Sequence, residues 1–498
     1  MGSNTASDGR IAVAPEARSG LDPWVRAELP VPPVPRGIGW LGAVGPGVIV
    51  LGVSLGSGEF LLGPAAFVRY GLSLLWITGI AVFLQTVFNT ELMRYTLATG
   101  EPVFTGFMRT GPSARAWGWL YAGLYFLQSG WPAWAANAAG AVFFLAIGRL
   151  AGAEDATVIH QIGVATFVGC VGVLLVGRRI ERTLELLNWI LVICILGGLL
   201  LLAVVFVPPA TWIATAAGFV GFDAAAGRFD FLPAGADLFL LAALAAYSGS
   251  GGVQNITLAN WARDKGYGMG QRAGYIPAVV GGRRVPLAHT GFMFDIDAEA
   301  LRRWHGWWRI IRADQWGVFF PGALLGMALP ALLYVTFLTP GSDIRGLGIA
   351  AALAQAIGAR SGAVLAGVVA VMGVWILLKT QLDIVEGMVR AITDILWSGS
   401  RRVRSWRGGD VRALYYAVLA AVVLWGIVAM RLAQPIVLLE LGANIAGAVF
   451  ILASLHLLYL NTRLLPPALR PPLWRRAVLV AMALFYGFFV VLSVRSLA

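Results

Sequence analysis

The chain has 498 residues, of which 58% are hydrophobic and only 12% are charged. Soluble domains carry about 25% charged residues, so this composition excludes an ordinary soluble enzyme and indicates a polytopic membrane protein. The net charge of +12 does not indicate nucleic-acid binding, because the basic residues are spread over loops between apolar segments instead of forming one basic patch.

Residues 1–36 precede the first apolar segment and combine Gly, Ser, Pro and Ala with scattered charges. They contain no apolar stretch of signal-peptide length. We therefore expect residues 1–36 to form a flexible cytoplasmic tail.

Eleven apolar segments follow, each close to the roughly 20 residues that a helix needs to cross a bilayer. The predicted spans are 40–67, 71–95, 116–148, 158–177, 184–208, 236–260, 316–338, 363–396, 413–430, 435–460 and 474–494. We expect the longest of them, the third and the eighth, to tilt or to extend beyond the membrane.

The basic residues alternate between the two sides of these predicted spans. The odd-numbered loops and the C-terminus contain few of them: Arg69, Arg149, Arg228, Arg345, Arg360, Arg431 and Arg495. Most of the others lie in the N-terminal segment and the even-numbered loops. By the positive-inside rule, this pattern places the N-terminus in the cytoplasm and the C-terminus outside. We expect a bacterial plasma-membrane protein.

Glycines interrupt the first and the sixth span. The first reads GPGVIVLGVSLGSGEFLLGP and contains Gly56, Gly58 and Glu59. The sixth contains SGSGGVQN, with Gly251, Gly252 and the polar side chains that follow. Unwound backbone at bilayer depth persists only where it lines a cavity or binds something. Two interrupted spans at matching places in two halves indicate the midplane site of a secondary transporter.

The interrupted spans also supply the polar groups of this predicted site. Glu59 is the one carboxylate of the first span, and Gln254 and Asn255 directly follow the second interruption. An unpaired carboxylate is costly to bury, so we expect Glu59 to face a cavity and to meet a cation or a proton.

The longest predicted loop, residues 262–315, lies on the cytoplasmic side. Its end, LRRWHGWWRIIR, places Trp and Arg side chains on a predicted amphipathic helix. Such a helix is typical of a segment that lies on the anionic surface of a membrane. Residues 345–361 predict another short amphipathic helix, on the outer side.

The eighth span carries an alternating row of charges, KTQLDIVEGMVRAITD. Lys379, Asp383, Glu386 and Arg390 are spaced by four, three and four residues and therefore share one helical face,. This row predicts either an internal ladder of ion pairs or a contribution to the substrate site. In the second case Gln381, Asp383 and Glu386 would lie near Glu59.

Other chemistry has little support in the sequence. There is no HExxH, GxSxG or phosphate-loop motif, so neither a hydrolase nor an ATP-driven pump is indicated. The two cysteines, Cys170 and Cys194, lie in apolar spans and predict no disulfide framework,. We expect no enzyme activity and no resident cofactor.

Several stretches, in order, resemble the Nramp family of metal-ion transporters. GPGVIV at 45–50 resembles the start of the family's first helix, and YGLSLLW at 70–76 resembles the entry to its second. Thr99 and Gly100 fall where that second helix ends in a TG pair. LAQAIGARSGAVLAGVVAVMGVWILLKTQ resembles the approach to the family's GQSST-like stretch in the eighth helix. The resemblance covers residues 40–495.

This resemblance implies an all-α integral membrane protein of LeuT type, with two inverted five-helix repeats and broken helices one and six. The first repeat would then occupy residues 37–208, the second residues 236–460, and residues 474–494 would form a peripheral eleventh helix.

The family's metal-binding motifs differ in this chain. Its first motif, DPGN, falls on Gly56, Ser57, Gly58 and Glu59, so the aspartate is replaced by glycine. Its second, MPHN, falls on Gly252, Val253, Gln254 and Asn255, which removes the methionine and a histidine. A further family histidine falls on Ala259, and two acidic positions of the third helix fall on Trp134 and Asn137.

We therefore hold three hypotheses. The first is a carrier of a divalent cation without proton coupling, in which Glu59, Gln254 and Asp383 are the metal ligands and oxygen-only ligands favour Mg²⁺ or Mn²⁺. The second is a LeuT-type carrier of a cationic amine or amino acid. The third is a non-transporting receptor or enzyme on the same scaffold. The expected partners are a small substrate and membrane lipids, and a monomer is consistent with the sequence.

Overall fold

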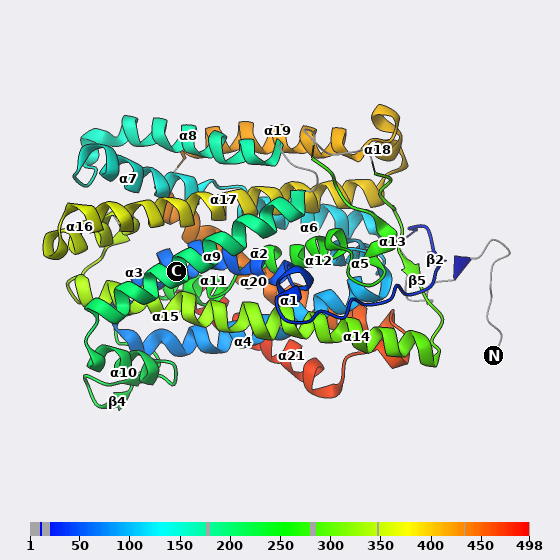
Figure 1. Ribbon diagram of the computed structural model, residues 1–498, viewed down its shortest axis with the longest axis horizontal. Coiled ribbons are helices and arrows are strands. Elements are labelled where there is room, and N and C mark those ends of the chain that lie inside the picture. Colours follow the sequence, from blue (N-terminus) through cyan, green and yellow to red (C-terminus); the bar gives the residue numbers. More distant parts are fainter. Residues whose placement is uncertain are drawn as a thin grey trace.

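The computed structural model describes residues 10–11, 20–175, 180–278, 285–345, 348–432 and 434–497. Ten helices in this part are long and apolar enough to cross a membrane, and the short apolar helix α11 belongs to a further, interrupted span. Figure 1 shows the long helices α4, α15 and α17 running along the long axis of the molecule. The eleven predicted spans are all recognisable.

The first five spans are built from the following elements: α1 Gly39–Ala43, α2 Pro46–Gly56, a π-helical turn at Gly58–Leu62, α3 Gly63–Tyr70, α4 Leu75–Thr99, α5 Val103–Met108, α6 Ala114–Ser129, α7 Ala133–Ile147, α8 Ala156–Gly172, α9 Ile180–Phe206 and α10 Pro209–Gly218. Single 3-10 turns at Leu72–Leu74, Ala153–Asp155 and Val173–Leu175 adjoin α4 and α8.

The remaining spans are built from α11 Leu238–Tyr247, α12 Val253–Lys265, α13 Gly270–Ala273, α14 Ala298–Asp314, a π-helical turn at Gln315–Phe319, α15 Phe320–Phe337, α16 Ile349–Ser361, α17 Ala363–Gly399, α18 Arg401–Ser405, α19 Val411–Ala429, α20 Pro435–Arg463 and α21 Leu473–Leu497. Single 3-10 turns lie at Trp406–Gly408 and Pro467–Leu469. α16 confirms the predicted short helix at 345–361.

Five short strands lie in the loops of the described part of the chain. β1 Arg10–Ile11, β2 Trp24–Arg26 and β5 Phe292–Met293 form one sheet, in which β1 and β2 are antiparallel while β2 and β5 are parallel. β3 Phe222–Asp223 and β4 Arg228–Phe229 form an antiparallel pair. The sheets therefore tie together loop segments that lie far apart in the sequence.

The first span changes conformation where its glycines predict a break. α2 ends at Gly56, Ser57 leaves the helical region with φ −102° and ψ −90°, and a π-helical turn follows. A Cβ atom on Gly58 would lie 2.0 Å from the carbonyl oxygen of Tyr247. Only glycine lets these two backbone segments approach so closely, which explains the residue type at this position.

The second break is longer and separates two helices. α11 ends at Tyr247 and α12 begins at Val253. Gly249, Gly251 and Gly252 have φ values of +100°, +85° and +49°. L-residues with side chains rarely adopt positive φ, so the run of glycines specifies this unwound segment.

Two spans differ from the prediction in their continuity. The predicted third span, 116–148, is divided between α6 and α7 at Gly130–Pro132. The Trp/Arg helix α14, expected to lie flat on the membrane surface, instead continues through a π-helical turn into α15 as one helical segment of 40 residues (Figure 1). The expected flat orientation is therefore wrong. The buried side of α14 is covered by residues 28–30, since Arg303 donates to Glu28 and to the carbonyl of Leu29, and Trp307 donates to the carbonyl of Pro30.

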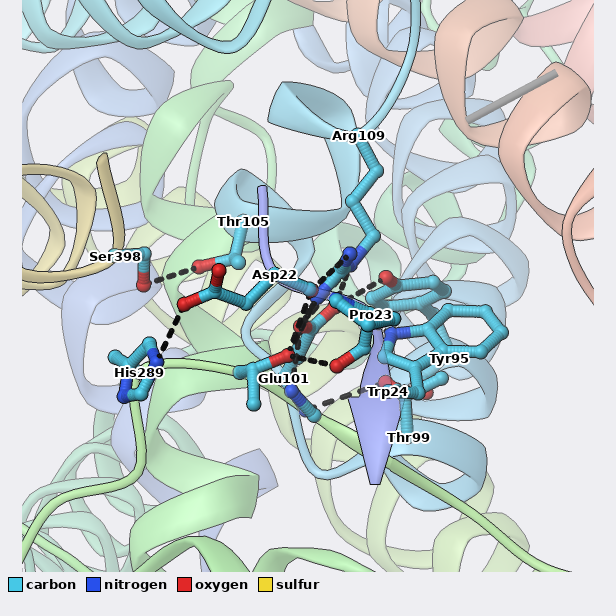
Figure 2. A network of polar contacts seen from close by, with 12 residues as sticks. Asp22, Pro23, Trp24, Tyr95, Thr99, Glu101, Thr105, Arg109, His289 and Ser398 are labelled. Atoms are coloured by element: carbon cyan, nitrogen blue, oxygen red, sulfur yellow. Dashed lines mark hydrogen bonds and ion pairs between the residues drawn. The ribbon is translucent and has the colours of Figure 1, made fainter. Parts of the chain in front are cut away.

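The predicted tail, residues 1–36, lies partly outside the described residues. Its described part from residue 20 onward packs against the bundle instead of extending freely. The indole of Trp24 is buried and donates to Glu101 at 3.1 Å, and Asp22 lies 2.9 Å from His289 (Figure 2). Glu101 also forms a buried ion pair with Arg109. This segment covers the end of the bundle that the charge pattern places in the cytoplasm.

Candidate functional site

The two breaks meet in the interior of the bundle. The close approach of Gly58 to the carbonyl of Tyr247 joins the end of α11 to the π-helical turn of the first span. Trp134 of α7 lies against the same place, because its indole donates to the hydroxyl of Ser57 at 3.0 Å and its ring centroid is 6.2 Å from that of Tyr247. We call this region the break junction.

Glu59 is the one acidic side chain on the π-helical turn of the break junction, and it is fully buried. Its Oε1 atom accepts hydrogen bonds from the hydroxyl of Ser54 and from the backbone N–H of Gly249, the latter at 3.3 Å. Its Oε2 atom accepts none from any described residue. The buried hydroxyl of Ser250 also lacks a hydrogen-bond partner within this part of the chain. The junction therefore contains one carboxylate with an available oxygen.

Side chains of the second and third spans hold the second break in place. Gln85 of α4 donates to the carbonyl of Ser248 at 2.6 Å. Gln128 of α6 donates to the carbonyl of Gly251 and accepts from the backbone N–H of Val253, both at 3.0 Å. These contacts satisfy backbone groups that no longer have helical partners. The sequence interpretation missed both glutamines, although an amide within an apolar span was the available signal.

Asn255, a predicted binding residue, faces the second span. Its amide donates to Gln85 at 3.1 Å and to Asn89 at 2.9 Å. Asn89 in turn donates to Gln315, which donates to Asp314. This buried polar chain leads away from the break junction.

Asp314, the last residue in this series of hydrogen bonds, caps the first span. Asp314 accepts hydrogen bonds from the backbone N–H groups of Gly45 and Gly47 at 2.7 and 2.8 Å. A carboxylate at this place complements the free N–H groups and the dipole at the start of α2. This series of hydrogen bonds thus links the start of the first span to the second break.

The two other predicted amide ligands contact neighbouring helices. Gln254 accepts from the hydroxyl of Tyr125 at 3.0 Å and donates to Ser129 at 3.3 Å. Gln381 accepts from the backbone N–H of Ala135 at 3.2 Å. Both amides are buried, and neither hydrogen-bonds to Glu59. Gly56 lies against the eighth span, since a Cβ atom there would be 2.3 Å from the hydroxyl of Thr380.

Asp383 belongs to a separate buried cluster. It forms an ion pair with Lys379 one turn away on α17, and the amide of Asn188 on α9 lies 3.4 Å from both carboxylate oxygens. This cluster packs against Gly52, where a Cβ atom would clash with Asn188 and Lys379. In the described part of the chain, no hydrogen bond or ion pair joins Asp383 to Glu59, whose partners are Ser54 and Gly249.

Glu386 lies in a second cluster of charges, between α12 and α17. It pairs with Arg390 and accepts from the indole of Trp261 at 2.7 Å. Arg390 also pairs with Asp264, and Arg263 bridges Asp264 and Asp394. The row of charges on the eighth span is thus an internal ladder of ion pairs, one of the two alternatives that its spacing predicted.

The chemistry of the break junction favours a cation. Among the described residues, no three His, Cys, Asp or Glu side chains lie close enough together to hold a metal ion. The hydrogen-bond partners of Glu59 are a hydroxyl and a backbone N–H, and no second acid joins it among the described residues. α2 and α11 end at the junction while the π-helical turn and α12 begin there, so the partial charges of the helix ends oppose one another and the Glu59 carboxylate is the main charge,.

The arrangement of the helices is similar to that of a manganese transporter from Eremococcus coleocola. A histidine-to-alanine variant of that protein aligns with a TM-score of 0.61 and 15% identity, covering 97% of this chain and 90% of that one. The structure of the same transporter in complex with an aromatic bis-isothiourea substituted compound aligns with a TM-score of 0.61 and 16% identity, and it covers 97% of this chain and 90% of that one. No family model and no curated protein matches the chain.

The likeness at this level of identity establishes the fold. The chain is an all-α integral membrane protein of LeuT type with broken helices one and six, as the sequence predicted.

Proposed function

We propose that the protein is a secondary transporter that binds a divalent cation, Mg²⁺ or Mn²⁺, at Glu59. The observation that carries this proposal is the buried carboxylate at the break junction, whose Oε2 atom has no hydrogen-bond partner among the described residues. A buried charge is stable only when it is paired or coordinates an ion. A transported cation would supply that partner.

The kind of donor favours a hard cation. Glu59 is contacted by the hydroxyl of Ser54 and the backbone N–H of Gly249, and the carbonyl of Tyr247 lies against the preceding residue, Gly58. Mg²⁺ binds through one or two carboxylates and retains several waters, which suits a junction with a single acid. The other predicted metal ligands, Gln254 and Asp383, have other partners, so in this proposal Glu59 is the principal charged ligand.

A cationic amine is the second candidate substrate. It is favoured by the two aromatic rings, Trp134 and Tyr247, that lie at the junction with Glu59. Aromatic faces attract organic ammonium groups, and a carboxylate supplies the counter-charge. Both candidates require Glu59, and they differ in whether Trp134 contributes.

Uptake by purified protein in liposomes tests the proposal. We expect uptake of Mg²⁺ or Mn²⁺ by the parent protein, and its loss in Glu59→Gln, which keeps the size of the side chain but removes the charge. Glu299→Gln is the comparison variant, because it removes a carboxylate of an exposed ion pair on α14 and leaves the break junction unchanged. Divalent-cation uptake in Glu59→Gln equal to that of the parent would contradict the proposal. Uptake of an amine that falls in Trp134→Ala, without divalent uptake, would select the second candidate.

A further inference from the structure

A basic and aromatic groove lies between the ends of α4, α14 and α21, far along the bundle from the break junction. It has a volume of about 810 Å³ and is open to the outside of the protein. Its lining consists of Arg94, Trp308, Arg309, Arg312, Ala313, Trp316, Pro472, Trp474 and Arg475. The start of α21 follows an even-numbered loop, so the charge pattern places this groove at the cytoplasmic surface of the membrane.

Two buried arginines form the floor of the groove. Arg94 is 5% and Arg475 is 6% exposed. Both contact Glu91, at 2.7 and 3.1 Å, and Arg475 also donates to the hydroxyl of Thr90. The guanidinium groups lie 4.2 and 5.1 Å from the ring centre of Trp308. Their positions are therefore fixed before any ligand binds.

Two further arginines form the rim, and they have no acidic partner. Arg309 and Arg312 of α14 are exposed, and neither forms an ion pair with any residue in the described part of the chain. Four guanidinium groups thus surround a groove in which the one adjacent carboxylate, that of Glu91, is already shared by the two arginines of the floor. The groove has an excess of positive charge.

An apolar strip continues from the groove along the bundle. Trp316 contacts the ring of Phe83 at a centroid distance of 5.9 Å and that of Phe320 at 5.3 Å. Phe83 is 39% exposed and its neighbour Ile80 is 42% exposed. Tryptophans beside exposed apolar side chains are typical of the boundary between headgroups and acyl chains.

We propose that this groove binds the phosphate headgroup of an anionic phospholipid from the cytoplasmic leaflet, with an acyl chain lying on the strip formed by Trp316, Phe83 and Phe320. The four arginines complement the phosphate, which guanidinium groups bind with charge-assisted hydrogen bonds. Basic pockets between membrane helices on the cytoplasmic side are suited to such headgroups. The lipid would connect the second, seventh and eleventh spans at one point.

Native mass spectrometry of the full-length protein tests this proposal. Protein reconstituted in mixed phosphatidylglycerol and phosphatidylcholine is released in detergent, and bound lipid is counted. We expect retained phosphatidylglycerol in the parent, and retention lower by roughly 30-fold in the double variant Arg309→Gln, Arg312→Gln, since each arginine near an anionic surface strengthens binding about fivefold. The floor arginines are left unchanged to preserve folding.

Two control variants and one competing ligand make the outcome decisive. Arg302→Gln alters an exposed arginine of the same helix that pairs with Glu299, and it should retain lipid as the parent does. Arg309→Lys, Arg312→Lys keeps the charge and should retain most of the lipid. Equal retention in the parent and in the glutamine variant would overturn the proposal. Displacement of the lipid by inorganic phosphate at millimolar concentration would identify a free-anion site and would overturn it as well.

Discussion

Gly58 is the residue on which the close contact between the two breaks depends most directly. We expect Gly58→Ala to lower the melting temperature and to abolish uptake, because the added methyl group would overlap the carbonyl of Tyr247. Overpacking of a buried site typically costs about 1–3 kcal/mol. Thermal unfolding in detergent and uptake in liposomes measure the two effects.

A second glycine provides the matched control for that variant. Gly197 lies within α9, and a Cβ atom there would meet nothing within 4 Å. Gly197→Ala should therefore be neutral or slightly stabilising, because alanine favours the helix. If the two substitutions had the same effect on uptake, the contact at Gly58 would not be essential.

The buried ion pair of Glu101 and Arg109 makes stability depend on pH. Burial alone would raise the pKa of Glu101, but the charge of Arg109 and the hydrogen bonds from Arg109, Tyr95 and Trp24 outweigh it and hold the pKa below its usual value. A lowered folded-state pKa stabilises the protein above the usual pKa of 4.5, and this contribution is lost as the pH falls through the folded-state pKa,. We expect the melting temperature to fall below about pH 4.5.

Removal of the carboxylate checks the source of this dependence. Glu101→Gln leaves the buried Arg109 without its counter-charge, which costs about 3–5 kcal/mol. The variant should melt at a lower temperature at neutral pH and lose part of the acid-dependent decrease. Glu299→Gln, at an exposed ion pair, should melt as the parent does. An unchanged pH profile in Glu101→Gln would assign the acid sensitivity to other carboxylates.

At the same scale, the residue types of the site were only partly predictable. Glu59 could be found because it is the one acid of the first span, so its burial at the break had a clear signal. Asp383 shares a helical face with Glu386, but spacing within one helix does not say which neighbour that face meets. Gln85 and Gln128 serve the second break from other spans, and no local pattern links them to it.

At the scale of elements, the N-terminal segment depends on Trp24. We expect Trp24→Ala to release residues 20–36 from the bundle, because it removes a buried indole and its hydrogen bond to Glu101. Large-to-small substitutions of this kind cost about 3–5 kcal/mol. Limited trypsin digestion should then cleave at Arg26 and Arg36 faster, while the melting of the spans changes little. Unchanged cleavage would show that the strand pairing of β2 holds the segment without the indole.

The elements themselves differ in how well the sequence predicts them. Both breaks appear where their glycines predict them. The second depends on glycines with positive φ, and the first depends on Gly58, which leaves room for the carbonyl of Tyr247. α14 was assigned to the membrane surface because of its amphipathic Trp/Arg pattern. That pattern is equally produced by a helix with one side against residues 28–30, and the sequence alone does not show what covers the apolar side.

At the scale of the whole molecule, the alternation of basic loops and the eleven apolar spans predicted the fold class without any motif. The arrangement of spans around two breaks then followed from the resemblance and is confirmed by the fold. The substrate was not predictable in the same way, because it depends on a few atoms at the break junction whose partners come from different spans.

Proton coupling of the proposed transport would involve the whole molecule. A coupled proton must pass along titratable groups from one side of the membrane to the other. The charges of the eighth span are paired, Asp383 with Lys379 and Glu386 with Arg390. In the sixth span, Gln254 and Ala259 stand where the Nramp family has histidines. We therefore expect substrate flux without proton influx, measured in liposomes that contain a pH-sensitive dye. Acidification that follows substrate uptake and disappears in Glu59→Gln would show that Glu59 itself carries the proton.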